Sequence, residues 1–232
     1  MHFKRFFKFK PNNNSLFIIF NDKKVLFDLE EKTFIFDEAY LNFKNYDLEI
    51  IGIAEDEGKN IYAVDVTSSN FNYKEQGYKS LIDYDLRFIL TSLSNNEINL
   101  IGRANQLLHW IKSNKYCGYC GSAKKFNDEE QALFCDCNKI MIYPSISPCV
   151  LALIQNGNQI LLARNALFPE GLFSALAGFI EVSETAEETI EREIFEEVRL
   201  KVKNIKYFGS QSWPFPSQLM LAYTCEFDSG EI

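Results

Sequence analysis

Four charged side chains close together in the second half of the chain could do chemistry. Arg192, Glu193, Glu196 and Glu197 fall in a segment with helical periodicity. At about 100° per residue, Glu193 and Glu197 project about 40° apart, beside the apolar stripe of that helix. Two carboxylates in this arrangement repel each other unless a cation compensates them. A hard divalent ion, which binds carboxylate and phosphate oxygens, would do so. An acidic, solvated helix face is the alternative.

The start of this helix is marked by a capping box. Thr185 and Glu188 have the spacing of an N-cap hydroxyl and the carboxylate that pairs with it, so the helix should begin near Thr185. Acidic residues fill the first turn, where the helix dipole favours them. The buried stripe is predicted to consist of apolar residues four apart: Ala186, Ile190, Ile194 and Val198.

A group of four cysteines forms a second candidate site. Cys117 and Cys120 have C-x2-C spacing, and Cys135 and Cys137 follow with one residue between them. Two thiolate pairs joined by a loop of this length can close a tetrahedral zinc site, and the glycines beside the first pair suit the tight turn that such a site needs. We favour structural zinc. Four reduced cysteines in a loop, or a redox role, are the alternatives.

Composition limits the classes of function. The 232 residues are 47% apolar and can form one large domain or two to three small ones. The net charge of −8 argues against broad binding to nucleic-acid backbones. The basic, Phe-rich start lacks a continuous apolar run and a cleavage site, and no apolar stretch is long enough to span a membrane. We therefore expect a cytoplasmic protein without a membrane partner.

The chain divides into three expected parts. Residues 1–96 hold short β-rich runs separated by turn residues, which indicate a mainly antiparallel unit. Residues 97–145 hold a helix over 97–113 and then the cysteine cluster. Residues 146–232 form a new domain, with a hairpin at Asn156-Gly157. The predicted strands are 16–20, 24–27, 33–36, 48–54 and 60–66 in the first part, and 149–154 and 160–163 in the third.

Residues 178–200 resemble the Nudix box, G-x5-E-x7-R-E-U-x-E-E-x-G-U, where U is a bulky aliphatic residue. The matching residues are Gly178, Glu184, Arg192, Glu193, Ile194, Glu196, Glu197 and Leu200. One position departs from the motif, because Arg199 stands in place of its last glycine. A helix end in the left-handed conformation is costly without glycine but possible.

The resemblance implies roles for the matched residues. In the Nudix family the glutamates of the R-E-U-x-E-E core hold divalent metals, an arginine orients a glutamate through a salt bridge, and the opening glycine ends the preceding strand. The metal ligands would be Glu193, Glu197 and the backbone of Ala177, with Mg²⁺ or Mn²⁺ as the catalytic ion. Arg192 would orient a glutamate, and Glu196 or Glu197 would orient the attacking water.

A second motif is similar to the SQPWPFP array of the NADH pyrophosphatase branch of the family. It covers residues 210–217, about a dozen residues after the box. Prolines alternating with aromatic residues form a stiff wall that can stack a nucleobase. That branch also has a β-rich N-terminal domain and a four-cysteine zinc ribbon. The substrate contacts implied by the resemblance are Gln211, Ser212, Trp213, Pro214, Phe215, Pro216, Ser217 and Gln218, together with Phe179, Tyr143, Glu130 and Arg87.

The resemblance implies a mixed α+β and α/β protein in which a β-rich domain and a zinc ribbon precede a Nudix α/β/α sandwich. It implies an NAD⁺ diphosphatase that hydrolyses NADH or NAD⁺ to nicotinamide mononucleotide and AMP, with removal of NAD caps from RNA as a further activity. The relatives act as homodimers. They also continue for several tens of residues past the position of Ile232, so we expect the Nudix domain to lack a further metal-binding glutamate, a last strand and a closing helix.

Two other functions stay open on the sequence. The first is a Nudix protein that binds a nucleotide without cleaving it. The second is a zinc-ribbon module that binds nucleic acid. The ribbon region has a mildly basic character that favours this second alternative, through Lys112, Lys115, Lys124, Lys125 and Lys139.

Overall fold

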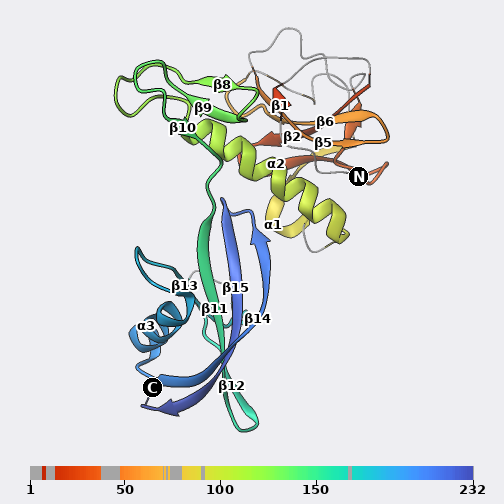
Figure 1. The fold of residues 1–232 in the computed structure, drawn as a ribbon. Helices are drawn as coiled ribbons and strands as arrows, with labels where there is room; N and C mark the ends of the chain where they lie inside the picture. Colours follow the sequence, from red (N-terminus) through yellow and green to blue (C-terminus); the bar gives the residue numbers. More distant parts are fainter. Residues whose placement is uncertain are drawn as a thin grey trace. The chain divides into compact units, whose positions relative to one another are not determined.

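The computed structural model describes residues 7–8, 14–37, 48–69, 71, 73, 80–89, 92–166 and 169–231 (Figure 1). Residues 1–6, which belong to the Phe-rich start discussed above, lie outside these ranges. The chain forms two compact units, Met1–Ser145 and Ile146–Ile232, and each is described by itself. Among the described residues, no helix is long and apolar enough to cross a membrane.

A twisted seven-stranded sheet is the main element of the first unit, with strand order β1-β5-β6-β2-β3-β7 and β4 beside β2. Its pairing is antiparallel as expected, except that β2 and β6 run parallel. These two strands are far apart in the sequence, so no hairpin dictates their direction. The strands are β1 (Phe7–Lys8), β2 (Ser15–Asn21), β3 (Lys24–Asp28), β4 (Phe36–Asp37), β5 (Glu49–Asp56), β6 (Lys59–Asp65) and β7 (Leu81–Asp85).

Two details of this sheet differ from the predicted strands. The strand expected over residues 33–36 is reduced to β4 and an isolated bridge between Asp28 and Thr33. Backbone amides 30 and 31 donate to the Asp28 carboxylate, and this turn interrupts the pairing. The edge strand β7 was not predicted. Its two aspartates interrupt the alternation of apolar and polar residues that marks a strand in the sequence.

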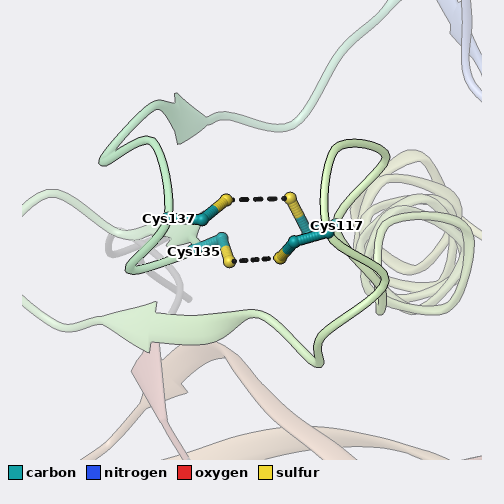
Figure 2. A group of neighbouring side chains, drawn as sticks. Cys117, Cys135 and Cys137 are labelled. Atoms are coloured by element: carbon teal, nitrogen blue, oxygen red, sulfur yellow. Dashed lines mark hydrogen bonds between the residues drawn. The ribbon is translucent and has the colours of Figure 1, made fainter.

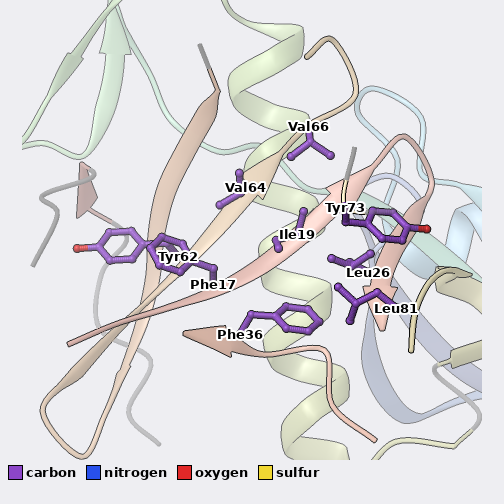
Figure 3. Packing of buried hydrophobic residues seen from close by; sticks show 9 residues of the cluster. All are labelled: Phe17, Ile19, Leu26, Phe36, Tyr62, Val64, Val66, Tyr73 and Leu81. Carbon is purple, nitrogen blue, oxygen red and sulfur yellow. The ribbon is translucent and has the colours of Figure 1, made fainter. Parts of the chain in front are cut away.

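Both faces of this sheet are buried. The residues of one face, together with Val66 and Tyr73 from the segment between β6 and β7, form an aromatic and aliphatic cluster (Figure 3). Its members are Phe17, Ile19, Leu26, Phe36, Tyr62, Val64, Val66, Tyr73 and Leu81. The alternate residues Ile18 and Phe20 point to the other face, where helix α2 (Asn95–Ser113) packs on β2, β5 and β6. Ser94 is the N-cap of α2 and part of a capping box, and the helix begins at Asn95, two residues before its predicted start. A short helix, α1 (Leu86–Ile89), follows β7.

The cysteine region forms a three-stranded antiparallel sheet of its own, in the order β10-β9-β8. Its strands are β8 (Lys125–Asn127), β9 (Ala132–Phe134) and β10 (Met141–Ile142). These strands are too short to bury a core, so the ribbon depends on another crosslink for stability.

The second unit is a five-stranded mixed sheet, with strand order β12-β11-β15-β14 and β13 beside β11. β11 and β15 are parallel and the other pairs antiparallel. The predicted hairpin after β11 is confirmed, and Gly157 adopts the positive φ that its turn requires. The strands are β11 (Ser147–Asn156), β12 (Gln159–Leu161), β13 (Leu176–Phe179), β14 (Lys201–Trp213) and β15 (Gln218–Ser229).

Helix α3 (Ala186–Val198) covers one face of this sheet. Among the described residues of the second unit, it is the one helix. The predicted capping box is present: the Thr185 hydroxyl accepts from the Glu188 amide, and Glu188 accepts from the Thr185 amide. The predicted apolar stripe is confirmed, with Ile190 and Ile194 fully buried against the strands.

The end of α3 is in the left-handed conformation. Arg199 has φ 60° and ψ 18°, in the place where the Nudix box has glycine. A non-glycine residue in this conformation costs about 1–2 kcal/mol. The guanidinium of Arg199 lies 5.4 Å from the centre of the Phe195 ring, a cation–π contact that offsets about 0.5–1 kcal/mol of that cost.

We predict that Arg199→Gly is more stable than Arg199→Ala by about 1 kcal/mol. Both variants lose the cation–π contact, so their difference isolates the backbone strain. Hydrogen exchange of the α3 amides, measured in both variants, gives the opening free energies to compare. Equal protection in the two variants would contradict the prediction.

Candidate active site and metal centres

Arg192 on α3 is bound by three carboxylates and a carbonyl. Its Nε and Nη2 donate to the two oxygens of Glu184, at 2.6 and 2.9 Å, in a bidentate pair. Its Nη1 donates to Glu193 Oε1 at 2.9 Å and to Glu196 Oε2 at 3.2 Å. Its Nη2 also donates to the carbonyl of Phe179, at 3.0 Å. One guanidinium therefore joins α3 to β13 and to the loop between them.

This pairing stabilises the charged forms of the partners. The Arg192 guanidinium lowers the pKa of Glu184 to about 2, aided by donors from the Glu181 amide and the Thr189 hydroxyl. Glu184 in turn raises the pKa of Arg192. Glu184 is therefore ionised at neutral pH and holds the arginine in a single orientation.

Gly178 is the residue that lets Glu193 approach the sheet. A Cβ at position 178 would lie 1.9 Å from the Glu193 carboxyl carbon, so any side chain there would occupy the space of this carboxylate. The glycine does not end β13, as the family resemblance implied, because the strand continues to Phe179. The close approach of Glu193 explains why glycine is needed at this position.

Glu197 lies one turn after Glu193 on α3. Glu197 is exposed, but partial desolvation of its carboxyl raises its pKa, and the negative charge of Glu193 raises it further. Within the part of the chain that the structure describes, no hydrogen-bond donor or cation pairs with the Glu197 carboxylate, whereas Glu193 has only Arg192. Of these two neighbouring carboxylates, Glu193 alone has a cationic partner. A divalent cation therefore fits this donor set, and hard oxygen ligands are those that Mg²⁺ and Mn²⁺ prefer.

The sheet register brings other predicted residues to the same end of the unit. Phe179 pairs with Cys149, Cys149 with Met220, and Met220 with Gln211. The row crosses four strands, so Phe179 and Gln211 are about 14 Å apart along it. Ala177, the predicted backbone ligand, pairs with Leu151 two residues along β13.

The SQSWPFPS segment is the tip of the β14–β15 hairpin. Its first half ends β14 at Trp213, its second half forms the turn, and β15 begins at Gln218. The rings of Trp213 and Phe215 meet edge to face, with centres 5.1 Å apart, and the Phe215–Pro216 bond is cis. Trp213 is 41% exposed, so part of its surface is free to contact a ligand.

The predicted contacts lie on different faces of the sheet. A Cβ at 178 would point at Glu193, so that face carries α3, and the neighbouring Phe179 faces the other way. By the register, Gln211 and Trp213 share the face of Phe179, whereas Ser212 faces the side of α3. Two exposed aromatic side chains, Phe179 and Trp213, thus lie on the face of the sheet opposite the one that α3 covers.

Three predicted substrate contacts lie in the first unit. The Tyr143 hydroxyl donates to Glu130 Oε2 at 2.8 Å, and this hydrogen bond raises the pKa of Tyr143. Arg87 is exposed on α1, and its backbone amide donates to Asp85 Oδ1. The structure thus pairs Tyr143 with Glu130.

The four cysteines converge in the ribbon (Figure 2). Their sulfurs all lie within 4.8 Å of one another, with Cys117 and Cys137 3.6 Å apart and Cys120 and Cys135 3.5 Å apart. Zinc–thiolate bonds of about 2.3 Å in a tetrahedron place sulfurs about 3.8 Å apart. The C-x-C pair therefore reaches the same centre as the C-x2-C pair, despite its shorter spacing.

The surroundings of the sulfurs favour thiolates in the C-x2-C turn. Backbone amides of residues 120 and 119 lower the pKa of Cys117, and the amide and hydroxyl of Ser122 lower that of Cys120 to about 6. Gly121 has the positive φ that this tight turn requires. The neighbouring thiols raise the pKa of Cys137, an effect that a bound cation would reverse. The cluster fits a structural zinc ion.

Cys149 and Cys225 lie in β11 and β15, apart from this cluster. Both are buried in the strands, as the apolar sequence around them indicated, and burial raises the pKa of each thiol. They act as small apolar side chains.

Two contacts of the site were not predicted from the sequence. The Phe179 carbonyl accepts from Arg192, and the buried Thr189 hydroxyl lies 2.9 Å from Glu184. Every residue has a backbone carbonyl, so the sequence does not indicate which one accepts a hydrogen bond. Thr189 did offer a signal, because a polar residue stands beside Ile190 on the buried side of α3.

We predict that the purified protein carries about one zinc per chain and that Cys135→Ser loses it. Cys225→Ala is the matched control and should keep its zinc, because Cys225 lies outside the cluster. Elemental analysis of the unsubstituted protein and the two variants gives the zinc content per chain. Zinc well below one equivalent in the unsubstituted protein would contradict the assignment.

We predict that Gly178→Ala weakens Mn²⁺ binding by at least about tenfold, because the added methyl displaces the Glu193 carboxylate. Gly209→Ala is the control, since a Cβ at that position meets no atom within 4 Å. Titration followed by electron paramagnetic resonance gives the affinities. Unchanged Mn²⁺ affinity in Gly178→Ala would show that Glu193 does not bind the ion from this position.

Comparison with known proteins places these features in a family. The NUDIX domain family matches residues 146–230. The chain is 35% identical over 211 residues to the NAD-capped RNA hydrolase NudC of Pseudomonas fluorescens (strain Pf0-1), covering 86% of this chain and 73% of that protein. It is 44% identical over 133 residues to the protein of the same name from Pseudomonas syringae pv. syringae (strain B728a), covering 57% of this chain and 48% of the relative.

Several such matches span about half the length of the relative, among them the 45% identity to the NAD-capped RNA hydrolase NudC of Enterobacter sp. (strain 638), which covers 52% of it. A solved structure, a NUDIX hydrolase from Nitrosomonas europaea, is 24% identical with a TM-score of 0.43, covering 50% of this chain and 69% of that one. The relative from Pseudomonas fluorescens matches over most of both chains. The chain therefore belongs to the Nudix hydrolase family, in its NADH pyrophosphatase branch.

Proposed function

We propose that this protein catalyses the metal-dependent hydrolysis of the pyrophosphate bond of NADH or NAD⁺, which gives nicotinamide mononucleotide and AMP. One observation carries the proposal: Arg192 holds the Glu193 carboxylate over Gly178, beside a Glu197 carboxylate with no cationic partner among the described residues. A site built to hold two carboxylates together suits divalent metal and phosphate chemistry.

The residues of the site would divide the work as follows. Glu193, Glu197 and the carbonyl of Ala177 would hold Mg²⁺ or Mn²⁺. When bound, such an ion polarises phosphate oxygens and lowers the pKa of a water molecule. Arg192 keeps Glu193 in place. Glu196, whose side chain is 58% exposed, and Glu197 are the candidates to orient the attacking water.

Exposed aromatic side chains on one face of the sheet would bind the substrate. Phe179 and Trp213 share a face of the sheet and offer rings on which a base can stack. The hairpin tip adds polar groups from Gln211, Ser212, Ser217 and Gln218, and its rigid turn has little entropy to lose on binding. Arg87, Tyr143 and Glu130 remain candidate substrate contacts, as the resemblance implies. We further propose a cytoplasmic homodimer, as the resemblance implies.

NAD-capped RNA is a second candidate substrate, favoured by the names of the relatives. The net charge of −8 is unfavourable for contacts to many RNA phosphates. The protein would therefore recognise the NAD cap itself, with little contribution from the RNA chain. The affinity for a capped RNA should then depend only weakly on salt.

The lysines of the ribbon region speak against a zinc-ribbon module that binds nucleic acid. Four of the five lysines pair with a total of three carboxylates in the first unit, so the basic character seen in the sequence is partly neutralised. Lys112 pairs with Asp65, Lys115 with Glu49, Lys125 and Lys139 with Asp136, and Lys124 donates to the carbonyl of Asn114.

We predict that the protein hydrolyses NADH with Mg²⁺ or Mn²⁺ and that Glu193→Gln and Glu197→Gln each lower kcat by about a hundredfold or more. Each loses a charge that the metal site needs. Glu191→Gln is the matched control, because Glu191 is exposed on the same helix and outside the carboxylate group. Chromatography of the mononucleotide products measures the rates.

The same experiment tests the alternative of a nucleotide-binding protein without activity. If the unsubstituted protein forms no more product than Glu197→Gln, the proposed hydrolase function is lost. NADH binding that persists in that case, measured by calorimetry, would establish the binding alternative.

A further inference from the structure

Thr189 is a buried polar residue beside the candidate site. It lies next to Ile190 on the buried side of α3. Its exposed fraction is 0%, and it matches no defined position of the Nudix box. Its hydroxyl oxygen lies 2.9 Å from Glu184 Oε2 and 2.9 Å from the carbonyl oxygen of Thr185. A hydroxyl has one proton to donate, so these two acceptors compete for it.

The charged acceptor is favoured in this competition. The Thr185 carbonyl already accepts from the Thr189 amide, at 3.1 Å, so it has a partner without the hydroxyl. Hydrogen bonds to an ionised carboxylate are also about twice as strong as those between neutral groups. The Thr189 proton therefore goes to Glu184.

This bond completes a set of donors that fixes Glu184. Its Oε2 also accepts from the Glu181 amide at 3.1 Å and from Arg192 Nη2 at 2.9 Å, and its Oε1 accepts from Arg192 Nε at 2.6 Å. The guanidinium is planar, so a rotation of the Glu184 carboxylate tilts the whole of Arg192. That tilt moves Nη1, the atom that holds the Glu193 carboxylate.

We propose that Thr189 is a positioning residue, which acts through Glu184 and Arg192 to hold Glu193 in the orientation that binds the metal ion. Its effect on metal binding is a property of this network, and its effect on the reaction rests on the proposed hydrolase function. Thr189 touches neither the ion nor the substrate.

The test compares Thr189→Val with Thr189→Ser in the full chain. Valine keeps the branched shape and loses the hydroxyl, whereas serine keeps the hydroxyl and loses a methyl group. Mn²⁺ affinity is measured by electron paramagnetic resonance, and kcat and KM for NADH are measured in parallel. Thermal melting shows that each variant is folded.

We expect Thr189→Val to bind Mn²⁺ about tenfold more weakly and to lose kcat in proportion, with KM for NADH little changed, as for other residues that orient metal ligands. Thr189→Ser should stay close to the unsubstituted protein in all three quantities. A role in packing alone predicts the opposite order, because serine leaves a cavity in the buried face and valine does not.

Other outcomes would contradict the proposed role of Thr189 or the proposed function. Mn²⁺ affinity in Thr189→Val equal to that of the unsubstituted protein, or a larger loss in Thr189→Ser, would overturn the proposal. If the unsubstituted protein binds Mn²⁺ but hydrolyses no NADH, the proposed function fails while the Mn²⁺ affinities still decide the role of Thr189. If it binds no Mn²⁺, both proposals fall.

Discussion

The ion pair between Arg192 and Glu184 is the interaction on which the candidate site depends. Both nitrogen–oxygen contacts of the pair are short, and Glu184 belongs to the loop before α3 while Arg192 belongs to the helix itself. The same guanidinium reaches the carbonyl of Phe179 in β13. Strand, loop and helix are thus held together by one planar group. Because its donors are fixed relative to one another, the position of Glu193 follows from the position of Glu184.

The charges at this site do not balance without a further cation. Within the described part of the chain, Arg192 is the one cation bound to Glu184, Glu193 and Glu196, and Glu197 lies beside them with a raised pKa. Bringing carboxylates together costs free energy in the absence of a counterion. The ribbon also brings negative charges together, but there the backbone amides of its own turn stabilise the thiolates. In both places the protein gathers negative charge of the kind that a metal ion would compensate.

Much of the local structure could be predicted from the sequence. The capping box at Thr185 and the apolar stripe of α3 both follow from residues within one or two turns of each other. The convergence of the four cysteines also follows from their spacing. Local predictions failed where a side chain redirects the backbone, as at Asp28, or where charges hide the strand period, as in β7.

The sequence by itself determined which chemical groups are present, where α3 begins, and to which family the motif belongs. Only the tertiary structure decided what these groups touch. Gly178 and Glu193 are 15 positions apart, and no local pattern shows that one leaves space for the other. The row from Phe179 to Gln211 exists because β11 and β15 pair in one register, and a shift of one residue would turn these side chains to the other face. Such contacts depend on how distant segments pack, which neither residue type nor periodicity encodes.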